Sequence, residues 1–231
     1  MSENRSFAAP ISPEDHVRIT AAVARAELRS AGEIVTVVAG RSDGYADVAL
    51  AWSALVAFLA LAALAIAPGF YMGIYDSLLA GWGHEWSPRA IFTLALGVAA
   101  IKFAGTLLLQ LWPPLKFLLV PPQVKTMRVH NRAIQAFRIG AERRTTGRTG
   151  VLIYLSMHER RAEIVADEAI ATRVDPQVWG DAMQAMLSEV REGRVADGMI
   201  AAIDRVGAIV AEHFPRAEND ANELPDRLIE V

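Results

Sequence analysis

Two long apolar runs constrain this sequence more than any other feature. The first covers residues 48–67, with Ser53 as its only polar side chain, and the second covers residues 90–112. A helix needs about 20 apolar residues to cross the hydrocarbon core of a bilayer, and each run has that length. The alternative, a pair of buried core helices, is disfavoured because 231 residues can hardly surround two helices that are apolar on all sides. We therefore predict a transmembrane hairpin.

Aromatic residues support the membrane interpretation. Four tyrosine and tryptophan residues gather in the loop between the runs, residues 69–89, and a fifth closes the second run: Tyr71, Tyr75, Trp82, Trp86 and Trp112. Aromatic rings with one polar edge prefer the interface between membrane and water. The loop is therefore expected to lie at one membrane surface.

Basic residues predict the orientation. The loop holds a single one, Arg89, whereas the far flanks hold several: Arg41, Lys116, Lys125, Arg128 and Arg132. Positively charged flanks stay in the cytoplasm. We expect a multi-pass protein of the inner (plasma) membrane with both termini in the cytoplasm, and with the lipid bilayer as its first partner.

Lys102 lies near the middle of the second run. A charged side chain at mid-membrane depth usually indicates a function. Here that function would be transport, and it would require an oligomer, because the two helices of one chain cannot form a path across the membrane. The other interpretation is that the true span is shifted and that the amine reaches the interface along its flexible stem. No acidic residue in the first run is available to pair with it.

Composition excludes several classes of protein. A net charge of −3 argues against a nucleic-acid partner. The absence of cysteine excludes disulfides, thiolate nucleophiles and cysteine-ligated zinc. The first fifteen residues lack the apolar stretch of a cleaved signal peptide, so the first run would have to direct insertion.

The remaining sequence predicts a small α/β domain. Residues 34–39 and 151–155 form two continuous apolar runs typical of strands buried on both faces, and residues 162–166 alternate as a third strand. A strand, a long crossover and another strand favour a parallel pair, and the short turn at 158–161 makes the third strand antiparallel to the second. Helical spacing predicts helices before the first strand, around 124–139, and in two stretches after residue 176.

The domain boundaries follow from this pattern. We predict a first part of the α/β domain at 1–47, the hairpin at 48–122, a second part of the domain at 123–215 and a charged tail at 216–231. The predicted helix around 124–139 is basic and amphipathic. Its cations would either meet anionic lipid headgroups or form a solvated face.

The α/β part resembles a TPM domain. The matching stretches are 30–39, 149–156, 159–167, 213–215 and 222–225. The resemblance implies an α/β/α sandwich with a short mixed sheet. Some members of this family are acid phosphatases or calcium binders, although neither activity is general. Many members stand outside the cytoplasm with a membrane helix after the domain, whereas here the hairpin interrupts the domain.

Candidate ligand-binding residues follow the first two strands: Arg41, Asp43, Glu159 and Arg160. Ligands of open α/β sheets favour the carboxyl ends of parallel strands. Asp43 and Glu159 offer oxygen ligands for Ca²⁺ or Mg²⁺, and the two arginines suit a phosphate or carboxylate. The alternative interpretation is that Asp43 stabilises a turn and that the other three residues form ion pairs at the surface.

No classical catalytic motif is present in the sequence. It lacks the nucleophile elbow, the phosphate-binding loop, the dinucleotide fingerprint and the zinc-protease motif. We therefore expect an integral membrane protein whose TPM-like domain acts as a binding or assembly module for a membrane protein partner, with a divalent cation as its candidate cofactor. The enzymatic alternative is a weak metal-dependent phosphatase that uses Asp43.

Overall fold

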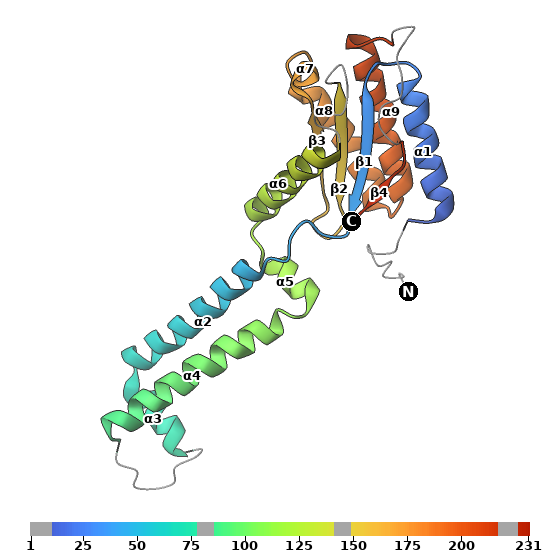
Figure 1. Ribbon diagram of the computed structural model, residues 1–231. Coiled ribbons are helices and arrows are strands. Elements are labelled where there is room, and N and C mark those ends of the chain that lie inside the picture. The colour runs from blue at the N-terminus through green and yellow to red at the C-terminus, as the bar shows by residue number, and fades with distance from the viewer. Residues whose placement is uncertain (1–10, 78–85, 141–148, 217–225) are drawn as a thin grey trace. The chain divides into compact units, whose positions relative to one another are not determined.

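The computed structural model describes residues 11–77, 86–140, 149–216 and 226–231, and the chain divides into two compact units. One unit contains residues 1–43 and 122–231, and the other contains residues 44–121. Trp82 and residues 222–225, which the sequence analysis used, lie outside the described residues. Each unit is considered by itself below, and both are drawn in Figure 1.

The larger unit is built on a four-stranded sheet in the order β3-β2-β1-β4. Its strands are β1 (Glu33–Ala39), β2 (Gly150–Ser156), β3 (Arg161–Ala166) and β4 (Ile229–Glu230). As the sequence predicts, β1 and β2 are parallel and β2 and β3 are antiparallel. The unpredicted β4 is parallel to β1 and places the end of the chain at the sheet edge.

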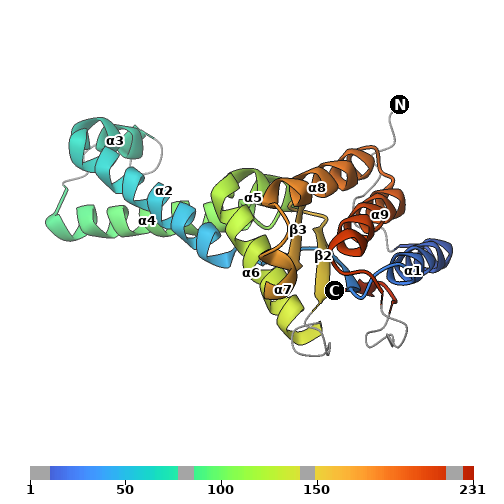
Figure 2. The same cartoon turned by 90° about the horizontal axis from the view of Figure 1, so that it is seen from above.

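Helices cover both faces of the sheet, which gives the expected α/β/α sandwich (Figure 2). α6 (Pro122–Gly140) packs on one face through Val129, Ala133 and Phe137. The other face carries α1 (Pro13–Glu27), α8 (Pro176–Arg191) and α9 (Val195–His213). Both faces of β1 and β2 are therefore buried, which is why their sequences are continuously apolar.

Close helix packing in this unit depends on glycine. A Cβ atom added at Gly207 of α9 would lie 2.6 Å from the Cβ of Ala26 in α1. One added at Gly198 would lie 2.6 Å from the carbonyl oxygen of Met186 in α8. These glycines let α9 approach both neighbouring helices. The short helix α7 (Glu168–Ala171), which the sequence analysis did not predict, connects β3 with α8.

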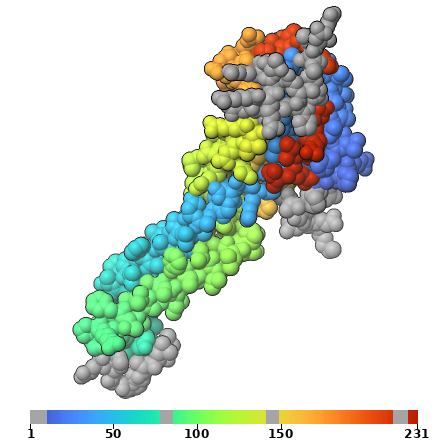
Figure 3. All heavy atoms as spheres, in the orientation of Figure 1, coloured from blue at the N-terminus to red at the C-terminus, as the bar shows by residue number. Residues whose placement is uncertain are grey.

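The described residues of the smaller unit form four α-helices. The two predicted spans are α2 (Ala46–Ile66) and α4 (Pro88–Leu109), which lie side by side in Figures 1 and 3. Both are long and apolar enough to cross a membrane. α3 (Pro68–Tyr75) occupies part of the expected loop, and α5 (Pro113–Leu119) follows the second span. Proline begins α3, α4 and α5, because the first helical turn tolerates its missing N–H group.

Candidate functional site

A cluster of polar side chains lies where β1 and β2 end. Tyr154 and Ser156 are two residues apart on β2, so they share the face that α6 covers. Ala39 pairs with Ser156 in the parallel register, which brings the loop after β1 to the same place. Ser42 of that loop and Glu159 of the turn after β2 complete the group, which we call the hydroxyl–carboxylate cluster.

Hydrogen bonds join all four members of this cluster. One Glu159 carboxylate oxygen accepts the backbone N–H of Ser42 at 2.9 Å, and the other accepts the Ser156 hydroxyl at 2.5 Å. The Ser42 hydroxyl lies 2.9 Å from that of Ser156 and 3.1 Å from that of Tyr154. Glu159 is only 6% exposed, and its buried carboxylate is stabilised by these donors. The cluster therefore fixes the two loops to each other.

Cations from α6 and β3 surround the cluster. Arg128 lies 3.3 Å from Asp43 in an ion pair. Burial raises the pKa of Tyr154, while Arg132 opposes the rise as a positive charge and a hydrogen-bond donor. Burial lowers the pKa of Lys125, repulsion from Arg161 adds to this effect, and Glu159 opposes it. The local excess of positive charge suits an anionic ligand better than a free cation.

The four predicted site residues have different environments. Asp43 pairs with Arg128, whereas Glu159 is held by Ser42 and Ser156, so the two carboxylates have separate partners. Arg41 and Arg160 are exposed, and Arg160 adopts a left-handed backbone conformation with φ of 51°. Within the described residues, no group of three or more histidine, aspartate or glutamate side chains is arranged to hold a metal ion.

Several members of the site were missed by sequence reasoning. The sequence places Tyr154 in a buried strand and Ser156 just after it, within a stretch of the family resemblance, although their spacing of two residues places both on one face. Arg128 and Arg132 were read as lipid-facing or solvated cations. Their spacing along α6 is helical, but only the tertiary structure shows that Arg128 meets Asp43 and that Arg132 acts on Tyr154.

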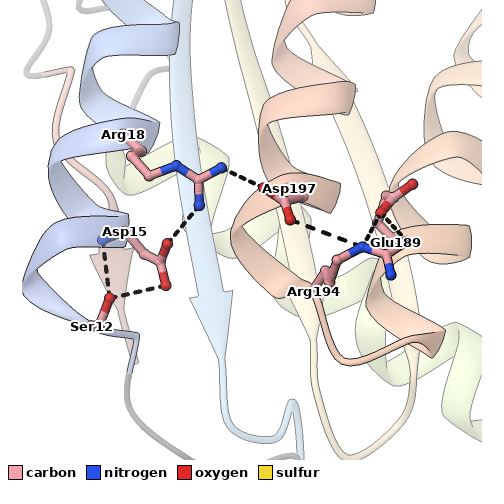
Figure 4. Close-up of polar contacts among 6 residues, drawn as sticks. All are labelled: Ser12, Asp15, Arg18, Glu189, Arg194 and Asp197. Atoms are coloured by element: carbon pink, nitrogen blue, oxygen red, sulfur yellow. Dashed lines mark hydrogen bonds and ion pairs between the residues drawn. The ribbon is translucent and has the colours of Figure 1, made fainter.

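A second polar network joins three helices on the other face of the sheet (Figure 4). Ser12 caps α1 by accepting the N–H of Asp15, and Arg18 then links Asp15 to Asp197 of α9. Arg194 contacts Glu189, Glu192 and Asp197, which ties the end of α8 to the start of α9. These side chains are partly exposed, and their ion pairs link the three helices to one another.

A buried carboxyl group lies near the amino end of β1. Glu27, at the end of α1, is 8% exposed and accepts the N–H of Ile34 at 2.8 Å. It borders a cavity of about 230 Å³ that Glu33, Arg216 and Asp226 also line. Burial raises the pKa of Glu27 to about 8, and the nearby Glu33 and Asp226 carboxylates add to the rise.

Comparison with known proteins agrees with this architecture. Residues 120–209 match the sequence model of the TPM domain family. The solution NMR structure of the BA42 protein from the psychrophilic bacterium Bizionia argentinensis is similar, with a TM-score of 0.55, 17% sequence identity and full coverage of both chains. At that identity the similarity concerns the fold. A search of curated proteins found no match.

The fold therefore defines an α/β/α sandwich domain interrupted by two apolar helices. Residues 120–209 therefore carry the match to the TPM domain family that the sequence resemblance predicts. The matched region runs from the end of α5 into α9, and α1 and β1 complete the sandwich from the other side of the insertion.

Proposed function

We propose that this chain is an integral membrane protein whose α2–α4 hairpin anchors the TPM domain at the cytoplasmic membrane surface, where the domain acts as a binding module. The observation that carries the proposal is the exposed apolar surface of the hairpin. The helix windows with the highest hydropathy are 11% buried in α2 and 0% buried in α4. A soluble protein would bury such helices in its core.

The exposed apolar side chains lie on both helices. Phe58 of α2 is 69% exposed, and Phe92 and Leu96 of α4 are 74% and 72% exposed. Burying such a side chain contributes about 1.5–3 kcal/mol. A bilayer would cover all of them at once, whereas water would leave this surface prone to association.

The polar groups between the helices are satisfied internally, as a lipid environment requires. Gln110 is 3% exposed, and its amide donates to the carbonyl oxygen of Ala49 at 3.1 Å and to that of Thr106 at 3.2 Å. The buried Ser53 hydroxyl donates to the same Ala49 oxygen at 2.8 Å. The bond from Gln110 to Ala49 joins the end of α4 to α2, and the other two bonds are local to one helix each.

The proposed binding site of the module is the hydroxyl–carboxylate cluster with its cations. Divalent-cation binding by Asp43 and Glu159 remains part of the proposal. A cation at Asp43 must displace Arg128, because the guanidinium already occupies that carboxylate. Replacing Arg128 with glutamine should therefore tighten cation binding, while Asp43→Asn should weaken it.

Membrane extraction tests the anchoring. Membranes from cells that express the full chain are washed with alkaline carbonate and then with detergent. We expect release only by detergent. A double variant, Leu55→Lys with Leu59→Lys, places two charges in α2 and should leave the chain in the carbonate-soluble fraction, because a charge at the helix centre costs about 2.5–3.5 kcal/mol. Release of the unaltered chain by carbonate would refute the anchoring.

Thermal stability tests the binding module. The detergent-purified full chain is heated with Ca²⁺, Mg²⁺ or EDTA, and separately with inorganic phosphate. A ligand at 100 times its Kd raises stability by about 2.7 kcal/mol. We expect a saturable shift that changes in Asp43→Asn and Arg128→Gln. No shift with any of these probes would contradict binding of small ions at this site.

A further inference from the structure

A large groove lies within the hairpin unit. It has a volume of about 1010 Å³ and lies among α2, α3 and α4. Small and apolar side chains form its walls, among them Ala60 and Ala63 of α2 and Gly97 and Val98 of α4. Ligand pockets in proteins commonly have volumes of about 300–1,000 Å³, so the groove is large enough for a substantial apolar ligand.

One end of the groove is polar and aromatic. Arg89 and Ser87 line it at the start of α4, and Tyr71, Tyr75 and Trp86 line it nearby. The Tyr75 and Trp86 rings are in edge contact, with centroids 5.1 Å apart. The indole N–H of Trp86 donates to Asp76, which does not line the groove. Aromatic residues beside a cation are typical of the headgroup level of a membrane.

Charge decides what kind of ligand fits this end. Arg89 and Lys102 line the groove, and no acidic residue is among its described lining residues. Arg89 is exposed in the loop-side first turn of α4, where the helix dipole adds to its positive charge. An anionic group at this end would pair with the guanidinium.

The two ends together match an amphiphile. We propose that the groove binds one anionic phospholipid, with its phosphate at Arg89 and an acyl chain along the apolar walls toward Lys102. Lys102 lies thirteen positions after Arg89, which corresponds to about 20 Å of helix, so the apolar part is an extended track. This inference rests on the anchoring proposed above, since the lipid reaches the groove from the bilayer.

A second copy of the chain is a poorer occupant of this groove. A symmetric dimer places the same surface patch of both copies in one interface. Arg89 and Lys102 of both copies would then face each other in a medium of low dielectric constant, with no acidic lining residue among those described. A phospholipid instead brings the missing negative charge.

Gly97 offers a way to block the groove without disturbing the helices. A Cβ atom added at Gly97 meets nothing within 4 Å, so Gly97→Leu places its side chain in open space. Gly105 has the same open surroundings but does not line the groove. Gly105→Leu is therefore a matched control on the same helix.

The experiment measures lipid retained by the purified full chain. Delipidated protein in mild detergent is incubated with equal amounts of phosphatidylglycerol and phosphatidylcholine, and bound lipid and oligomeric state are read by native mass spectrometry. We expect about one phosphatidylglycerol per chain. Arg89→Gln should lower its retention about tenfold, which corresponds to one lost charge-assisted contact. Gly97→Leu should remove both lipids, and Gly105→Leu should retain phosphatidylglycerol.

Three results would overturn the proposal. These are equal retention of the two lipids by the unaltered chain, full retention by Gly97→Leu, and a change of oligomeric state in Gly97→Leu without a change in lipid. The last result would assign the groove to a second copy. Carbonate extraction shows whether the lipid site or the anchoring has failed. If the chain stays in the membrane after carbonate and still gives any of these three results, the lipid site is refuted and the anchoring is not.

Discussion

Replacing Glu27 with glutamine should make the TPM domain more stable at high pH and leave it unchanged at low pH. Burial beside Glu33 and Asp226 raises the pKa of Glu27 from 4.5 to about 8. The folded protein therefore holds this proton between those values, while the unfolded chain releases it. Unfolding then releases a proton, so stability falls as pH rises through this range.

The magnitude follows from the two pKa values. The difference between 4.5 and about 8 corresponds to about 4–5 kcal/mol of stability lost between low pH and pH 9. Glutamine is uncharged, and its amide oxygen can still accept the N–H of Ile34 that Glu27 accepts at 2.8 Å. The variant therefore keeps the hydrogen bond and avoids the buried charge. At about 2–4 °C per kcal/mol, its melting temperature should exceed that of the unaltered chain by roughly 10 °C at pH 9.

The assay is thermal unfolding of the detergent-purified full chain at several pH values from about 5 to 9. The control is Glu212→Gln, which removes an exposed carboxylate from α9. We expect the melting curves of Glu27→Gln and the unaltered chain to differ least near pH 5 and to separate as pH rises, while the control shows a constant offset. A difference that is independent of pH, or one that grows toward low pH, would refute the assignment of a raised pKa to Glu27.

Three further substitutions test the packing and the site, each by the melting temperature of the full chain. Thr36→Val should stabilise it by about 1–2 kcal/mol, because Thr36 is 1% exposed and its hydroxyl has no hydrogen-bond partner among the described residues. A loss of stability would show that the hydroxyl is satisfied. Gly198→Ala should cost about 1–3 kcal/mol, since its Cβ would lie 2.6 Å from a carbonyl oxygen of α8. Its control is Gly180→Ala, because a Cβ atom added at Gly180 meets nothing within 4 Å and should not destabilise α8. Equal effects of the two substitutions on the melting temperature would contradict the close approach of α9 to α8. Glu159→Ala should cost about 2–3 kcal/mol, because it leaves two buried donors without an acceptor, and an unchanged melting temperature would show that the cluster does not hold the loops.

The strands that the sequence predicted are those with strong local patterns. β1 and β2 are continuously apolar because helices cover both faces, and the short turn before β3 specified its antiparallel pairing. β4 has only two residues, Ile229 and Glu230, and joins the sheet by pairing with β1. No local pattern of two residues could have indicated that pairing. α3 lies in a stretch that the aromatic residues marked as an interfacial loop.

The candidate site was predictable in position but not in detail. The rule that ligands favour the carboxyl ends of parallel strands led to Asp43 and Glu159. The partners of these residues are far away in the sequence: Ser42 contacts Glu159 across 117 positions, and Arg128 reaches Asp43 from α6. Such contacts depend on the register of β1 against β2 and on the rotation of α6, neither of which a single sequence specifies.

The most direct test of the account is the membrane topology of single-cysteine variants. The chain has no cysteine, so each introduced thiol is the only one that a maleimide can label. Ser77→Cys lies after α3 in the segment between α2 and α4, and Ser188→Cys lies on the exposed side of α8 in the TPM domain. In intact spheroplasts, a membrane-impermeant maleimide should label Ser77→Cys, while Ser188→Cys should react only after lysis. Labelling of both thiols before lysis, or of neither, would contradict a hairpin that crosses the membrane twice and holds the TPM domain in the cytoplasm.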